Sequence, residues 1–364
     1  MEPGKNTGVL LEIRPTDFRV GGETAIVYEV RLASGDWEKY RPTDEWQRRL
    51  MAGILGYDTL SCVTFSALRC VAMQIEFLIE TGQAPDAFVL FLKENGYIDE
   101  NGKVNFNEHF TAVMSGTTTN GNSGVAVWDS IRKDGLLAQS AGPAVNDFTT
   151  TEAWLANTIT QAQKDAAKKI LEWLTIQYEW VALGVSGQQA NFAKHLKQAP
   201  LHYFTPVCPT WNSGEVSSCG RYILDHATSG IAILPDLRYT DLDHYVPFIK
   251  HLAADYYVPY AIKGLVRINA APTTAPAFTH TYTVSLTYGM RATAEVRLLQ
   301  QGLQTAKDSA GKPYMTPGLF GIYGTATRAA VDRFQRDHGI IDPVPGEHFG
   351  PQTRAALTAA LLKN

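Results

Sequence analysis

The chain has 364 residues, of which 45% are hydrophobic and 19% are charged. This length suits two domains rather than one, and this composition suits a fold that needs no disulfide scaffold or bound metal. The formal net charge is −4, so we expect no nucleic-acid partner, which would require a clustered basic face. The four cysteines and nine histidines form no C-x-x-C pair and no H-E-x-x-H motif. We therefore expect no metal or other cofactor.

Two features bear on the compartment. No apolar run approaches the roughly 20 residues that a membrane-spanning helix needs, so we expect no membrane insertion. Residues 1–8 lack a basic start followed by a continuous apolar stretch, and we expect no secretory signal peptide. The protein would then be made in the cytoplasm.

Helical patterns dominate the first half of the chain. Ser61 to Ile79 carries apolar residues at helical spacing, with Ser61 as a plausible N-cap and Thr81-Gly82 as a stop. A second helix is predicted over 125–133, and a third from Thr151 to about Trp180.

The pattern changes after residue 200. Short β-prone runs occupy 201–207, 231–234 and 264–268. Helices first and strands later predict an α+β fold with an antiparallel sheet, rather than alternating βαβ units.

A change of composition separates the last part of the chain. Residues 269–277 are rich in Pro, Ala and Thr, as linkers are, and 278–288 alternate as a strand does. A helix is predicted over 294–306. Tyr323-Gly-Thr-Ala-Thr-Arg-Ala-Ala330 is echoed 26 residues later by Phe349-Gly-Pro-Gln-Thr-Arg-Ala-Ala356, and each copy predicts a turn followed by a helix. We therefore place a domain over 1–268, a linker and strand over 269–291, and a small all-α three-helix domain over 292–364.

The C-terminal motifs resemble the peptidoglycan-binding domain of many wall hydrolases. They are Val296-x-x-Leu-Gln300, Gly321-x-Tyr-Gly-x-x-Thr-x-x-Ala-Val-x-x-Phe-Gln335 and Gly346-x-x-x-Gly-x-x-Thr353. The resemblance implies three helices that present a shallow groove to bacterial peptidoglycan. Tyr323 and Arg328, in or near the turns, are the candidate wall-binding residues. The alternative is a general docking module in which Tyr323 is only packed.

The segment Asp58-Thr-Leu-Ser-Cys-Val-Thr-Phe-Ser-Ala67 resembles the nucleophile segment of papain-like cysteine peptidases. In that family the cysteine opens a long buried helix. The chemistry suits this position, because a helix N-terminus favours the thiolate nucleophile and its N–H groups can stabilise an oxyanion. Cys62 is therefore the candidate nucleophile, and the alternative is a small buried hydrophobic residue. We expect Cys70, two turns further along, to be such a core residue.

A cysteine nucleophile needs a base. Asp225-His226-Ala227 lies beside a β-prone run, as the histidine does in papain-like enzymes, and Asp243 follows His226 by 17 residues. The resemblance implies a Cys62–His226–Asp243 triad. Asp236 also follows His226, but it lies in the expected exit turn of the strand. The alternative role for Asp243 is to cap the next segment.

The sequence also departs from the papain pattern. The family carries an oxyanion-donating Gln six residues before the cysteine, where this chain has Gly56, and the nearest upstream glutamine is Gln47. The remaining cysteines, Cys208 and Cys219, flank a turn-rich stretch. They form either a disulfide or two reduced thiols.

Together these features predict a hydrolase: a papain-like cysteine peptidase or amidase that acts on peptide bonds at the cell wall. We expect a bacteriophage endolysin or a virion-associated lysin, which reaches the wall after lysis or within a phage particle. Its partners would be peptidoglycan, a peptide or protein substrate and other phage particle proteins. The alternative is an inactive papain-like scaffold that serves as a particle or adhesion protein.

Overall fold

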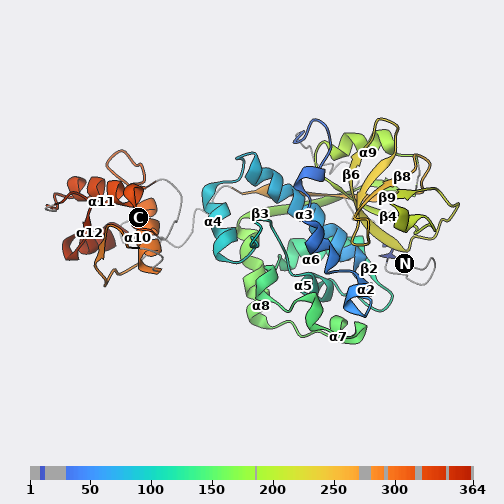
Figure 1. Cartoon of the computed structure of the whole chain (residues 1–364), viewed down its shortest axis with the longest axis horizontal. Coiled ribbons are helices and arrows are strands. Elements are labelled where there is room, and N and C mark those ends of the chain that lie inside the picture. The colour runs from blue at the N-terminus through green and yellow to red at the C-terminus, as the bar shows by residue number, and fades with distance from the viewer. Residues whose placement is uncertain are drawn as a thin grey trace. The chain divides into compact units, whose positions relative to one another are not determined.

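The computed structural model describes residues 9–12, 30–184, 187–269, 280–290, 294–315, 322–341 and 344–361. The chain divides into two compact units (Figure 1). One comprises 1–84 and 91–269, and the other comprises 85–90 and 270–364.

Helices form most of the chain up to residue 170. The α-helices in this part and α9 just beyond it are α1 (Asp44–Arg48), α2 (Ala52–Leu55), α3 (Cys62–Glu80), α4 (Asp86–Glu94), α5 (Glu108–Met114), α6 (Gly124–Asp134), α7 (Thr151–Leu155), α8 (Gln161–Lys168) and α9 (Gln189–Leu196). Short 3-10 helices are η1 (Glu38–Tyr40), η2 (Gln139–Ala141), η3 (Val145–Asp147), η4 (Lys169–Glu172) and η5 (Trp211–Ser213).

The central element is α3. It begins and ends within one residue of the predicted bounds, and every residue from Cys62 to Leu78 is buried. Its length and apolar composition would suffice to cross a membrane, but 94% of its most apolar window is buried inside the protein. A helix that is apolar on all sides and enclosed in this way is a core helix. It packs between α5, α6 and three strands of the sheet, β4 (Leu201–Thr205), β6 (His226–Ile233) and β9 (Tyr260–Ile268) (Figure 1).

The second half of this unit forms a seven-stranded sheet with the order β3-β9-β4-β6-β7-β8-β5. Its strands are β3 (Leu174–Leu183), β4 (Leu201–Thr205), β5 (Glu215–Val216), β6 (His226–Ile233), β7 (Tyr239–Leu242), β8 (Ile249–Leu252) and β9 (Tyr260–Ile268). All neighbours are antiparallel except β5 and β8. The predicted α+β architecture is confirmed. Two further short strands, β1 (Val9–Leu10) and β2 (Asn122–Ser123), pair in parallel.

The predicted helix from Thr151 to Trp180 is wrong. Helix α7 ends at Leu155, and the Thr160 side chain caps the new helix α8. The chain then enters β3, where Leu174-Thr-Ile-Gln-Tyr-Glu-Trp-Val181 pairs with β9. Branched and aromatic residues in near alternation favour a strand, and pairing with β9 outweighs the helical tendency of the preceding Ala- and Lys-rich run.

Polar side chains fix α3 on the sheet. Gln74 Nε2 donates to Gly264 O of β9 at 3.1 Å, and its Oε1 accepts from Val266 N at 3.0 Å. Nearer the start of the helix, Ser66 Oγ donates to Thr228 O of β6 at 2.5 Å. Because buried hydrogen bonds need their partners in place, these contacts hold α3 at one position along β6 and β9.

The C-terminal unit has its own core. It contains β10 (Leu286–Thr287), α10 (Ala294–Thr305), α11 (Thr325–Asp337), β11 (His348–Phe349) and α12 (Pro351–Leu361). Helices α11 and α12 each begin two residues into a copy of the repeated motif, and the first residues of the two copies, Tyr323 and Phe349, are fully buried. Within 280–288, the described part of the predicted strand over 278–288, the structure shows β10 alone, and most of the linker lies outside the described residues.

Candidate active site

Cys62 is the first residue of α3. Just before it, Asp58 Oδ1 accepts a hydrogen bond from Leu60 N at 2.8 Å, and Leu60 has a φ of 51°. A bulky residue rarely adopts this left-handed conformation, so the backbone turns sharply into the helix. The turn leaves Cys62 at the positive end of the α3 dipole. The residue is buried, with 6% of its surface exposed.

His226, the first residue of β6, is fully buried. The hydrogen bond between Ser66 and Thr228 joins α3 and β6 close to both side chains. Ser66 lies one helical turn after Cys62, and Thr228 lies two residues after His226. The Cys62 side chain is also among the groups that raise the pKa of His226. The structure therefore brings the candidate nucleophile and base together.

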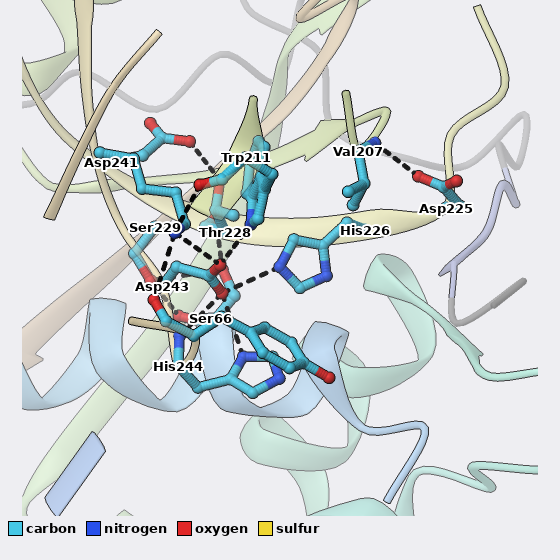
Figure 2. A network of polar contacts seen from close by, with 12 residues as sticks. Ser66, Val207, Trp211, Asp225, His226, Thr228, Ser229, Asp241, Asp243 and His244 are labelled. Atoms are coloured by element: carbon cyan, nitrogen blue, oxygen red, sulfur yellow. Dashed lines mark hydrogen bonds and ion pairs between the residues drawn. The ribbon is translucent and has the colours of Figure 1, made fainter. Parts of the chain in front are cut away.

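Asp243 directly follows β7, the strand that returns beside β6. Its Oδ1 lies 2.9 Å from Nε2 of His226, and both side chains are fully buried. Figure 2 shows the carboxylate pointing at the imidazole ring. Asp236, in contrast, lies on the exposed turn after β6, where its Oδ2 accepts from Arg238 Nε at 2.7 Å. The structure thus places Asp243 and not Asp236 against His226, whereas the catalytic role of the three residues stays a prediction.

Other donors surround the Asp243 carboxylate (Figure 2). Trp211 Nε1 donates to Oδ2 at 2.7 Å, and the backbone N–H of His244 donates to Oδ1 at 2.7 Å. The His244 ring nitrogen Nδ1 lies 3.1 Å from the same oxygen, and Lys250 Nζ lies 3.9 Å from Oδ2. A buried carboxylate stays ionised only with such partners. Sequence reasoning missed Trp211, because nothing in its spacing marks it as a neighbour of Asp243.

The charges of the pair support each other. Burial lowers the pKa of His226, but the Asp243 carboxylate, followed by the Cys62 side chain, raises it above its ordinary value. Burial likewise opposes ionisation of Asp243, yet the His226 imidazolium and the His244 contact hold the pKa of this carboxyl well below its usual range. His226 therefore keeps its proton at neutral pH. Its Nε2 is bound to Asp243, so Nδ1 is the nitrogen available to Cys62.

Two neighbouring groups remain neutral. Burial raises the pKa of the Cys70 thiol to about 12. Burial also lowers the pKa of His244 to about 4, although Asp243 works in the other direction. Cys70 is thus an unreactive core thiol, as predicted from its depth along α3, and only His226 of the two histidines is protonated at neutral pH.

No side-chain donor is present six residues before Cys62, the position at which papain-like peptidases carry their oxyanion-donating Gln. Gly56 ends α2 in the left-handed conformation, with a φ of 77°, and carries no side chain. Gln47 of α1 is fully buried, and its side-chain amide makes no hydrogen bond within the described residues. The backbone N–H groups at the start of α3 are the donors that the described geometry offers beside Cys62.

His226, Asp243 and His244 are spaced as metal ligands can be, because one nitrogen or oxygen atom of each lies within 4.8 Å of the others. Their hydrogen bonds account for this spacing, and Lys250 Nζ at 3.9 Å from Asp243 would repel a cation. We assign no metal to these residues.

Cys208 and Cys219 are joined by a disulfide, with their Cα atoms 5.8 Å apart. Of the two alternatives that the sequence left open, the structure has the bonded form. The bond closes the loop that carries Trp211.

The candidate wall-binding residues of the C-terminal unit differ in exposure. Tyr323 is fully buried, and its hydroxyl donates to Gly346 O at 2.8 Å. The side chain is packed, as in the alternative that the sequence left open, and it holds the turn before β11. Arg328 is half-buried, stacks on the exposed Tyr288 ring at 5.3 Å and donates through Nε to Pro345 O at 3.2 Å. It remains the candidate surface contact.

Comparison with known families agrees with the C-terminal motifs. Residues 292–357 match a family described as "Putative peptidoglycan binding domain". No curated protein sequence matches the chain.

Solved structures of cysteine proteases are similar to the larger part of the chain. Xylellain, a cysteine protease from Xylella fastidiosa, is 13% identical, with 74% of this chain and 97% of that chain covered and a TM-score of 0.45. Digestive procathepsin L 3 of Tenebrio molitor larval midgut is 12% identical, with 68% and 74% covered and a TM-score of 0.42. Procathepsin B S9 from Trypanosoma congolense is 8% identical, with 72% and 87% covered and a TM-score of 0.40. Because the identities are this low, the roles proposed for Cys62, His226 and Asp243 rest on the geometry of these residues in this protein.

Proposed function

We propose that this protein is a cysteine peptidase or amidase that is held on the bacterial cell wall by its C-terminal unit. The observation that carries the proposal is the buried pair of His226 and Asp243, 2.9 Å apart, placed beside a cysteine at the N-terminus of a core helix. A structural histidine would need neither the buried anion nor the cysteine.

In the proposed mechanism, the Cys62 thiolate attacks the carbonyl carbon of an amide. The negative oxygen of the tetrahedral intermediate is stabilised by N–H groups at the start of α3. His226 then donates its Nδ1 proton to the leaving amine, which departs and leaves an acyl group on Cys62 sulfur. His226 next accepts a proton from water, whose oxygen attacks the acyl carbon and releases the acid, and Cys62 leaves as the thiolate beside the protonated His226. Asp243 keeps the proton on Nε2 throughout and so fixes the tautomer.

The C-terminal unit supports the choice of substrate. The match to a peptidoglycan-binding family over 292–357 suggests that the peptidase acts on peptides of the wall or on proteins attached to it. The Cys208–Cys219 disulfide is of a kind that persists outside the reducing cytoplasm. We therefore also propose action at the wall after lysis or from a phage particle. Steady release of the protein from intact cells through a general export route would argue against this delivery.

An epoxide inhibitor tests the active site without knowledge of the substrate. We expect one inhibitor molecule to add to Cys62 of the wild type, as mass spectrometry of the peptides would show, and little addition in His226→Ala. The second candidate function, an inactive scaffold, is favoured by Gly56 at the position of the oxyanion donor. It predicts that Cys62 of the native wild type reacts no faster than a cysteine of the unfolded chain.

A further inference from the structure

The loop between Cys208 and Cys219 reaches the buried side of the active site. It carries Trp211, which is 1% exposed. The indole Nε1 donates to Asp243 Oδ2 at 2.7 Å, and the indole ring stands edge-on to the His226 ring, with centroids 5.4 Å apart and an angle of 89°. One side chain from this loop thus touches both members of the buried pair (Figure 2).

Several contacts hold the loop against the sheet. The disulfide joins its two ends. Within it, Ser217 N donates to Thr210 Oγ1 at 2.9 Å. Toward the sheet, the buried Lys250 Nζ donates to Trp211 O at 3.0 Å, and His251 N of β8 donates to Gly214 O at 2.7 Å. The position of Trp211 therefore depends on the loop being closed.

The two oxygens of Asp243 have different partners. Oδ1 accepts from the backbone of His244 and faces His226, whereas Oδ2 accepts from Trp211. The carboxylate can rotate about its bond to Cβ. A fixed donor on Oδ2 therefore sets the plane of the carboxylate and keeps Oδ1 directed at the imidazole. Lys250 Nζ lies 3.9 Å from Oδ2, which is beyond hydrogen-bond distance.

We propose that the disulfide-closed loop is a positioning element of the active site, in which Trp211 fixes the Asp243 carboxylate and thereby the His226 ring. This inference rests on the proposed function, since it concerns the same residues. It adds a redox consequence. A dithiol such as dithiothreitol transfers two electrons and two protons to the Cys208–Cys219 bond, yielding two thiols and the oxidised reagent. The same reagent that keeps Cys62 reduced would then loosen the loop and lower the reactivity of Cys62.

Trp211→Phe tests the positioning role, because it removes the N–H donor and keeps an aromatic ring. We expect alkylation of Cys62 by iodoacetamide at neutral pH to slow by about tenfold to a hundredfold, the usual contribution of a hydrogen bond to a charged group. We also expect the acid limb of the alkylation profile to move to higher pH, because a carboxylate with fewer donors is protonated more easily. A purely structural role would not move the pH profile.

Trp37→Phe is the matched control. Trp37 is also fully buried, and its Nε1 donates to a backbone oxygen, that of Leu196, at 2.6 Å. We expect this variant to lose stability without a change in the alkylation profile. If Trp211→Phe, with a native circular dichroism spectrum, gives the wild-type rate and profile, the inference is wrong.

The double variant Cys208→Ser/Cys219→Ser tests the loop itself and does not depend on Trp211→Phe folding. We expect the same direction of change as in Trp211→Phe, and no further loss with dithiothreitol. A wild-type profile in the double variant would contradict the role of the disulfide. If instead Cys62 of the native wild type reacts no faster than in the unfolded chain, the proposed function fails. The two failures are therefore distinguishable.

Discussion

Replacing Asp243 by Asn removes the negative charge of the buried pair and keeps its shape. The amide oxygen can still accept from His226, but the amide nitrogen then faces Trp211 Nε1, which donates to Oδ2 in the wild type. In the flipped orientation the amide nitrogen faces His226 instead. In either orientation the amide N–H2 faces another N–H donor, that of Trp211 or that of His226. Asn therefore cannot make both hydrogen bonds that Asp243 makes.

The size of the effect follows from burial. Both side chains are fully buried, and breaking such a pair by removing one partner costs about 3–5 kcal/mol. This corresponds to roughly a hundredfold to several-thousandfold change in the acid dissociation constant of His226. Burial alone lowers the pKa of His226, and Asp243 is the main group that raises it. In Asp243→Asn the imidazolium should therefore lose its proton at lower pH.

Two assays detect the lowered pKa of His226 in Asp243→Asn. Addition of the epoxide inhibitor to Cys62, in which ring opening takes a proton from the His226 imidazolium, should show an alkaline limb that moves to lower pH in Asp243→Asn. The unfolding free energy gives the second reading. Because the pKa of His226 is raised to about 10 in the folded protein, its stabilising contribution is complete below about pH 6.5 and is lost as the pH rises through about 10. Asp243→Asn should lack this alkaline loss of stability.

Asp236→Asn is the control, because Asp236 lies on an exposed turn. We expect it to match the wild type in both assays. If Asp243→Asn also matches the wild type, or if Asp236→Asn reproduces the loss, the assignment of Asp243 to the buried pair is wrong.

Three further predictions concern other parts of the chain. Iodoacetamide should label Cys62 well before Cys70 in the native protein, because burial raises the pKa of Cys70 to about 12; equal labelling of both would favour an inactive scaffold. Residues 285–364, which have a core of their own, should pellet with insoluble peptidoglycan at low salt, and a folded fragment that stays in the supernatant would refute wall binding. Cys208→Ser/Cys219→Ser should lower the unfolding free energy by about 3 kcal/mol, the value for a loop of this length, as denaturant titration would measure.

The core helix and the candidate site residues were easier to predict from the sequence than the strands of the sheet. The helix that begins at Cys62 was predictable because its apolar residues recur at helical spacing and Thr81-Gly82 follow as a stop. His226 and Asp243 could be placed together because a strand, a turn and a return strand fit 17 residues, and β6 and β7 have this arrangement.

The errors have physical causes. The run from Leu174 to Leu183 was predicted as a helix, because the Ala- and Lys-rich residues before it hide the change to near alternation, and its partner β9 lies far along the chain. For Tyr323 the motif left a wall contact and a packed ring both open, and the ring is packed. Trp211 contacts Asp243 across 32 residues of sequence, and no local pattern marks such a contact.

The most direct test is to incubate purified peptidoglycan with the full-length protein and with its Cys62→Ala variant, and to follow newly formed amino groups together with soluble fragments. We predict that both proteins pellet with the wall material and that only the wild type releases amino groups. Equal release by Cys62→Ala, or no release by a wild type whose Cys62 reacts with the epoxide inhibitor, would contradict the proposal of a wall-directed cysteine peptidase.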